Sequence, residues 1–265
     1  MNPEFLLYLA AGAAAGILSG LFGVGGGLII VSILTLAFSA LGFAEANIMH
    51  LALGTSLATI VLTSISSARA HHRLGNVNWQ VVQQITPGII IGTLLGAILA
   101  AHLNSLWLKG VFAVFVFGVA TQLLLNIKPA PHRNLPRPLL VSLMGAIIGV
   151  VSSLVGIGGG TLSVPFLIHC NTDTRHAIGT SAAIGLPIAV AGTVGYIYTG
   201  VGVGQLPPLS LGFVYLPAFA GIAITSMATA PFGAALAQRL PVPTLKRLFA
   251  LLLYIVGAKM LWGMF

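Results

Sequence analysis

Two glycine clusters are the residues of this sequence best suited to bind a ligand through the backbone. One lies in "GLFGVGGGLIIVS" and the other in "LVGIGGGTLSVP", each within a hydrophobic run. Each glycine disfavours a helix by about 1 kcal/mol relative to alanine. A helix broken there exposes N–H groups and a positive dipole end, which attract anions. The candidate substrate-binding glycines are Gly23, Gly25, Gly26, Gly27, Gly156, Gly158, Gly159 and Gly160.

Close packing is the alternative role for glycines in such a chain, because small residues four apart let two helices approach. Gly12 and Gly16, repeated as Gly145 and Gly149, form such stripes upstream of the clusters, and for them packing is the favoured interpretation. For the two clusters, a helix break that lines a site is favoured. Neither cluster ends in the Gly-Lys-Ser/Thr of a nucleotide-binding loop.

A second polar motif, Gly-Thr-Ser, occurs at residues 54–56 and again at residues 179–181. Its hydroxyls could cap backbone groups freed by the breaks, or they could donate hydrogen bonds to an oxyanion. Both roles stay open. The hydroxyl residues taken as substrate-binding candidates are Thr55, Ser56, Thr180 and Ser181.

His50 and Arg175 occupy equivalent positions just before the two Gly-Thr-Ser motifs. They could attract an anion into a vestibule, or they could simply lie at the membrane interface. The acids Glu4, Glu45 and Asp173 fall near the ends of apolar segments, and Asp173 is expected to cap a helix. A cation carrier or proton relay usually has acids within its spans. The distribution therefore favours an anionic or neutral substrate.

The composition excludes an ordinary soluble domain. Of 265 residues, 57% are hydrophobic and 5% are charged, whereas a soluble domain has roughly 25% charged residues. The chain is therefore expected to lie in a lipid bilayer. Its formal net charge of +8 is attributed to basic loops that face lipid head groups, with no nucleic-acid partner. No cofactor, metal site or catalytic constellation is expected, so the chain is not interpreted as an enzyme.

The chain is an internal repeat. Besides the glycine clusters, "ALGTSLATI" recurs as "AIGTSAAIG", and "LKGVFAVFVFGV" recurs as "LKRLFALLLYIV", in the same order. We divide it into a first transmembrane repeat (1–127), a cytoplasmic linker (128–138) and a second transmembrane repeat (139–265). Basic loops place both the 69–73 region and the linker in the cytoplasm, with Lys109 as the exception. Five crossings per half would invert the second half relative to the first, as in many secondary transporters.

The predicted fold is thus an all-α membrane protein. It is a polytopic helical bundle of two homologous, inverted halves, with eight to ten membrane segments and helices broken at the glycine-rich motifs. If the short segments beside the glycines are re-entrant, the count falls towards eight and the argument for inversion weakens.

The pattern of both glycine motifs, each followed by Gly-Thr-Ser, with "LPVPTLKRLFALLLYIVGAKML" near the end, resembles the TauE/SafE family of sulfite exporters along essentially the whole chain. The resemblance implies a multi-pass carrier of a bacterial or archaeal cytoplasmic (inner) membrane. It also implies small sulfur-containing anions, such as sulfite or sulfoacetate, as substrates, often in export.

The sequence therefore predicts a secondary transporter that moves a small sulfur-containing oxyanion by alternating access. The alternatives are an anion channel and a carrier or importer of another small solute. The identity of the anion, the direction of transport and the coupling ion are left open. So is the oligomeric state, with a homo-oligomer among the options.

Overall fold

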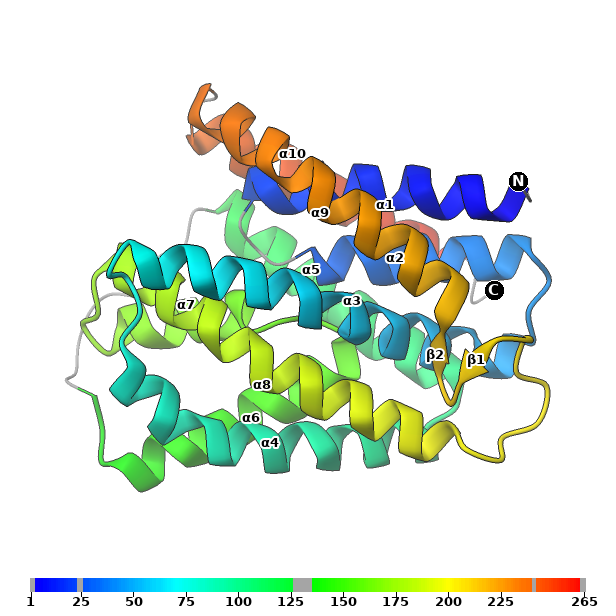
Figure 1. The fold of residues 1–265 in the computed structure, drawn as a ribbon, viewed down its shortest axis with the longest axis horizontal. Helices are drawn as coiled ribbons and strands as arrows, with labels where there is room; N and C mark the ends of the chain where they lie inside the picture. The colour runs from blue at the N-terminus through cyan, green and yellow to red at the C-terminus, as the bar shows by residue number, and fades with distance from the viewer. Residues whose placement is uncertain (1–2, 23–25, 126–134, 240–241, 263–265) are drawn as a thin grey trace.

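The computed structural model describes residues 3–22, 26–125, 135–239 and 242–262, and within them the chain is almost entirely helical (Figure 1). One short hairpin, β1–β2, precedes α9 and pairs Ser210 with Tyr215 in antiparallel register. The elements in chain order are α1 (Pro3–Phe22), α2 (Gly27–Ala40), α3 (Glu45–Arg73), α4 (Trp79–His102), α5 (Ser105–Leu124), α6 (Pro138–Val155), α7 (Gly160–His169), α8 (Thr174–Gly200), β1 (Ser210–Leu211), β2 (Val214–Tyr215), α9 (Leu216–Arg239) and α10 (Val242–Trp262).

Polar residues between the apolar runs set where several helices begin. The side chains of Asn78 and Asn104 accept hydrogen bonds from the first turns of α4 and α5. Asp173 accepts the N–H groups of Arg175 and His176 and so caps α8, which confirms the expected role. The hydrogen bond that its carboxylate receives from the His176 ring lowers the pKa of Asp173, which keeps the cap charged.

Five helices of the described residues are long and apolar enough to cross a membrane, namely α3, α4, α5, α6 and α8. The chain is therefore a multi-pass, all-α membrane protein, as its composition predicts. Helices α2 and α7 are shorter, with 14 and 10 residues. These two short helices are the ones that directly follow the glycine clusters.

Helices α3 and α8 form the centre of the bundle. They pack against each other and run in opposite directions along the long axis (Figure 1). In the most apolar stretch, 78% of α3 and 61% of α8 is buried, against 33% of α5. The two Gly-Thr-Ser motifs lie on these two helices, so both motifs face protein rather than lipid.

The remaining long helices pack in pairs across glycines. Helix α1 lies against α9, where Cβ atoms added to Gly12 and Gly16 would come within 2.6 Å of the Ile222 and Ser226 Cα atoms. Helix α4 lies against α6 in the same way, through glycines of both helices. The stripes at Gly12, Gly16, Gly145 and Gly149 are thus packing surfaces, which confirms the sequence interpretation.

Replacing Gly88 by alanine should force α4 and α6 apart. The added Cβ atom would lie 1.7 Å from the Ser142 carbonyl oxygen, and a backbone atom cannot yield as a flexible side chain does. Overpacking of this kind costs about 1–3 kcal/mol. We expect a lower thermal unfolding midpoint in detergent for Gly88→Ala. For Gly118→Ala we expect an unchanged or higher midpoint, since a Cβ at Gly118 meets nothing within 4 Å and alanine favours the helix. Equal midpoints would show that glycine contact does not hold this helix pair.

Candidate functional site

The glycine clusters coincide with helix ends. Gly26 is the N-terminal cap of α2 with a left-handed backbone (φ 71°), and Gly27 is the first residue of that helix. Gly156 is the C-terminal cap of α6, also left-handed (φ 68°). Both positions therefore disfavour any residue with a Cβ atom. The candidates Gly23 and Gly25 lie outside the described residues.

The two clusters meet in the interior. A Cβ atom on Gly27 would lie 2.6 Å from the carbonyl oxygen of Gly156 and 2.9 Å from the Cα atom of Ile157. The Ser56 hydroxyl donates a hydrogen bond to that same Gly156 oxygen at 2.9 Å, and it lies 3.5 Å from the oxygen of Gly27. Backbone from residues far apart in the sequence is thus in direct contact.

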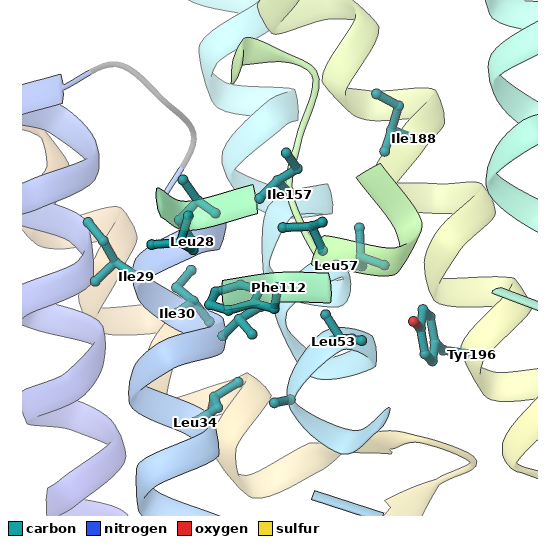
Figure 2. Packing of buried hydrophobic residues seen from close by; sticks show 14 of the residues in the cluster. Leu28, Ile29, Ile30, Leu34, Leu53, Leu57, Phe112, Ile157, Ile188 and Tyr196 are labelled. Carbon is teal, nitrogen blue, oxygen red and sulfur yellow. The ribbon is translucent and has the colours of Figure 1, made fainter. Parts of the chain in front are cut away.

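Apolar side chains surround this contact on several sides. Figure 2 shows Leu28 of α2, Leu57 of α3 and Phe112 of α5 converging on Ile157, which lies between α6 and α7. Each of these side chains is essentially fully buried. The contact between Gly27 and Gly156 is therefore enclosed by buried apolar side chains.

The threonines of the Gly-Thr-Ser motifs hold the loops that lead into distant helices. The Thr55 hydroxyl oxygen accepts the backbone N–H of Tyr215, at the start of α9, at 3.0 Å. The Thr180 hydroxyl oxygen accepts the backbone N–H of Asn78, at the start of α4, also at 3.0 Å. Thr55 and Thr180 therefore make equivalent contacts, and each joins the first half of the chain to the second.

The glycines of these motifs make room for the same loops. A Cβ atom on Gly54 would lie 2.4 Å from the Phe213 oxygen, and one on Gly179 would lie 2.4 Å from the Asn76 oxygen. In both motifs the glycine admits the backbone and the threonine binds it. The sequence analysis did not predict that each Gly-Thr-Ser motif binds the backbone of a loop in the other half. The pairing of a glycine with a neighbouring hydroxyl is nevertheless visible in the repeat.

The serines of the two motifs differ. Ser56 donates its hydrogen bond to Gly156, as described above. Ser181 is equally buried, but its hydroxyl has no hydrogen-bond partner among the described residues. Gly159, the cap of α7, lies directly against it: a Cβ there would be 3.0 Å from the Ser181 carbonyl oxygen and 3.2 Å from the Gly185 nitrogen. A Cβ atom on Gly158 would instead lie 3.3 Å from the Cγ2 atom of Ile60.

His50 and Arg175 lie in unlike surroundings despite their equivalent positions. His50 is buried, with Nε2 at 2.9 Å from the Ala100 oxygen and its ring stacked on Phe213 at 4.9 Å. Arg175 is exposed in the first turn of α8. The contacts of His50 therefore join α3 to α4 and to the hairpin. Only Arg175 has the exposure that capturing an anion from water requires.

Among the described residues, Lys109 is the one buried Lys or Arg side chain, and it pairs with the exposed carboxylate of Glu45. Lys109, 11% exposed, contacts Glu45 at 3.0 Å, and Ser39 donates a further hydrogen bond to that carboxylate. Lys109 is the exception to the rule that basic residues lie in cytoplasmic loops. The negative charge of Glu45 compensates its positive charge, which accounts for this exception. The other buried polar side chains described are hydroxyls, Asn47 and His50. The interior can therefore offer an anion hydrogen bonds and helix dipoles.

Comparison with known proteins agrees with this arrangement. The chain matches the family described as Sulfite exporter TauE/SafE over residues 8–260. It is 42% identical to a probable membrane transporter protein of Haemophilus influenzae, over 98% of this chain and 99% of the relative. It is 29% identical to one of Methanocaldococcus jannaschii, over 97% of each chain, and 30% identical to YdhB of Bacillus subtilis, over 70% of this chain and 76% of the relative. No solved structure matches it significantly.

Replacing Thr55 by valine should destabilise the protein more than the same change at Thr180. Valine keeps the shape but leaves the backbone N–H of buried Tyr215 without its acceptor, which costs about 1–3 kcal/mol. Asn78, the partner of Thr180, is exposed, so water can replace the lost hydroxyl. Thermal unfolding in detergent would measure both changes.

Thr193→Val is the matched control, because the Thr193 hydroxyl only donates to the Ala189 carbonyl of its own helix. We expect this variant to unfold close to wild type. A Thr55→Val protein as stable as the Thr193→Val protein would contradict a role for Thr55 in holding the two halves together.

Proposed function

Because the chain belongs to the sulfite exporter TauE/SafE family and is a multi-pass membrane transporter, we propose that it is a secondary carrier of a small sulfur-containing oxyanion. Sulfite and organosulfonates such as sulfoacetate are the proposed substrates. Export across the cytoplasmic membrane, by alternating access, is the proposed direction. The family description supports this choice of anion and direction.

The observation that carries the proposal is the meeting of the two glycine clusters. Gly27, the first residue of α2, contacts Gly156, which ends α6, and α7 begins only a few residues later. Two short helices thus start in the interior of a membrane protein, where their first N–H groups lack partners within the helix. Anionic substrates bind at such half-helix ends near the bilayer midplane in many transporters.

The proposed ligands are the backbone N–H groups and hydroxyls around this point. They are the residues predicted from the sequence, and Gly23 and Gly25 complete the first cluster. The Thr55 and Thr180 oxygens accept backbone N–H groups, so their own O–H groups can still donate to a substrate. Of the two vestibule candidates in the set, Arg175 is exposed and His50 is buried. The whole proposed set is Gly23, Gly25, Gly26, Gly27, Thr55, Ser56, Gly156, Gly158, Gly159, Gly160, Thr180, Ser181, His50 and Arg175.

We also propose that residues 1–127 and 139–265 are inverted repeats that rock against each other. The helix contacts support this: α1 packs on α9 as α6 packs on α4, while α3 packs on α8 and α5 on α10. Exchanging each helix for its counterpart in the other half leaves this pattern unchanged. The opposite directions of α3 and α8 in Figure 1 fit the same relation. Helix α2 lies towards one end of the bundle and α7 towards the other.

An anion channel would use the same glycines but needs a continuous open path. The direct contact of Gly27 with Gly156 fits an occluded carrier and equally the closed state of a channel. Electrical recording on bilayers separates the two, because a channel gives ohmic unitary currents and a carrier does not. Counterflow with competing solutes would identify a carrier or importer of another small solute.

Replacing Gly159 by leucine should abolish transport while leaving the protein in the membrane. A Cβ atom at this position is already 3.0 Å from the Ser181 oxygen, so the larger side chain would fill the start of α7. We expect loss of sulfite counterflow in proteoliposomes. Gly118→Leu, which enters open space, should transport normally. Wild-type counterflow by Gly159→Leu would refute the site. Absence of sulfite counterflow in the wild-type protein would refute the proposed substrate.

A further inference from the structure

The residues that follow the two glycine clusters differ in polarity. The first cluster continues as "GGGLII" and the second as "GGGTLS". In the repeat, Leu28 corresponds to Thr161 and Ile30 corresponds to Ser163. The first turn of α2 is therefore apolar, and the first turn of α7 carries two hydroxyls.

The N-terminus of α7 has backbone N–H donors that have no acceptor within their own helix. Its cap is Gly159, which offers no side-chain oxygen to the helix. The first hydrogen bond of the helix is the one that the Ser163 N–H donates to the Gly159 oxygen at 2.8 Å. The N–H groups of residues 160–162 precede it and have no acceptor within the helix.

Three buried hydroxyls near this terminus also lack partners among the described residues. Ser163 is 0% exposed, Ser181 of α8 is 1% exposed, and the Thr161 oxygen is shielded from water. Ser163 lies in the first turn of α7, and Ser181 lies against Gly159. Buried polar groups are nearly always satisfied, because leaving one unsatisfied costs about 1–3 kcal/mol. Several such groups at one helix end indicate a ligand that supplies acceptors.

The equivalent position in the first half has no such unpaired hydroxyls in its described residues, although the first N–H groups of α2 also lack acceptors within their helix. Leu28 and Ile30 are buried in the apolar core, at 1% and 3% exposure. Ser56, the counterpart of Ser181, already donates to Gly156. The hydroxyl of Ser32, further along α2, donates to the Leu28 carbonyl. This side of the centre is a packed wall.

We propose that the oxyanion is bound by the second half alone, by the first turn of α7 with Thr161, Ser163 and Ser181, and in its singly charged form. The inference rests on the proposed function and assigns its binding groups. Within the set of residues proposed above, it selects those of the second half as the direct ligands, and it assigns Gly26 and Gly27 to the opposite wall of the site.

The preference for a single charge follows from what surrounds the site. The one buried cation among the described residues outside the histidines, Lys109, is already paired with Glu45. A helix N-terminus contributes only about half an elementary charge. The cost of removing an ion from water scales with the square of its charge, so a dianion costs about four times as much as a monoanion of similar size. Hydroxyls and one dipole therefore suit hydrogen sulfite or a sulfonate better than sulfate.

Ligand-induced thermal stabilisation of the purified protein would test this at constant ionic strength. The probes are sulfite, methanesulfonate as a fixed monoanion and sulfate as a fixed dianion. We expect sulfite and methanesulfonate to stabilise the wild type, and sulfate to bind at least about tenfold more weakly. Ser163→Ala and Ser181→Ala should each weaken methanesulfonate binding roughly tenfold, as expected for a lost hydrogen bond to a charged group.

Stability without ligand separates binding from folding. Removing an unsatisfied hydroxyl should leave the ligand-free midpoints of Ser163→Ala and Ser181→Ala unchanged or raised. Ser32→Ala is the matched control in α2 and should bind methanesulfonate as the wild type does.

Two results would overturn the inference while leaving an oxyanion carrier in place. These are wild-type affinity in both alanine variants of the second half, and sulfate binding as tight as methanesulfonate binding. A wild-type protein that none of the three anions stabilises would overturn the inference together with the proposed substrate class.

Discussion

Close approach of backbones at glycine is the constraint on which this structure depends. Apolar side chains gain little by leaving lipid for protein, so helices in a bilayer associate through tight packing and hydrogen bonds. Gly12 lets α1 meet α9, and Gly88 lets α4 meet α6. Gly27 and Gly156 allow the same close approach of backbones at the centre of the bundle. There the backbones of elements from the two halves of the chain are in direct contact.

The polar links between the halves differ in kind from this central contact. Thr55 binds the backbone at Tyr215, and Thr180 binds the backbone at Asn78, each through a directional hydrogen bond. At the centre, Ser56 supplies one such bond and the rest is packing. A movement that separates Gly27 from Gly156 would break few hydrogen bonds, whereas the threonine links could persist as pivots. The arrangement thus suits the rocking motion proposed for the carrier.

The sequence was sufficient to predict segments but not their partners. Apolar runs and the capping Asp173 defined helices, and the spacing of Gly12 and Gly16 defined a packing face, because these features depend on local geometry. The role of Thr55 could not be derived in this way, since its partner lies 160 positions further along the chain. The burial of His50 against Phe213 could not be derived either, since it depends on a hairpin in the other half. Gly23 and Gly25 stay predictions.

Two halves that pack alike can still carry a binding site in only one of them, because helix packing and anion binding depend on different residues. In the proposed carrier, exchange between two access states is easiest when both halves pack alike, and the matched contacts of Gly54 and Gly179 fit that requirement. One small anion needs only one set of donors, however. A second set of buried, unsatisfied hydroxyls in α2 would cost stability in every state without binding anything. Leucine and isoleucine at positions 28 and 30 avoid that cost, so the apolar half of the repeat is as much a part of the binding design as the polar half.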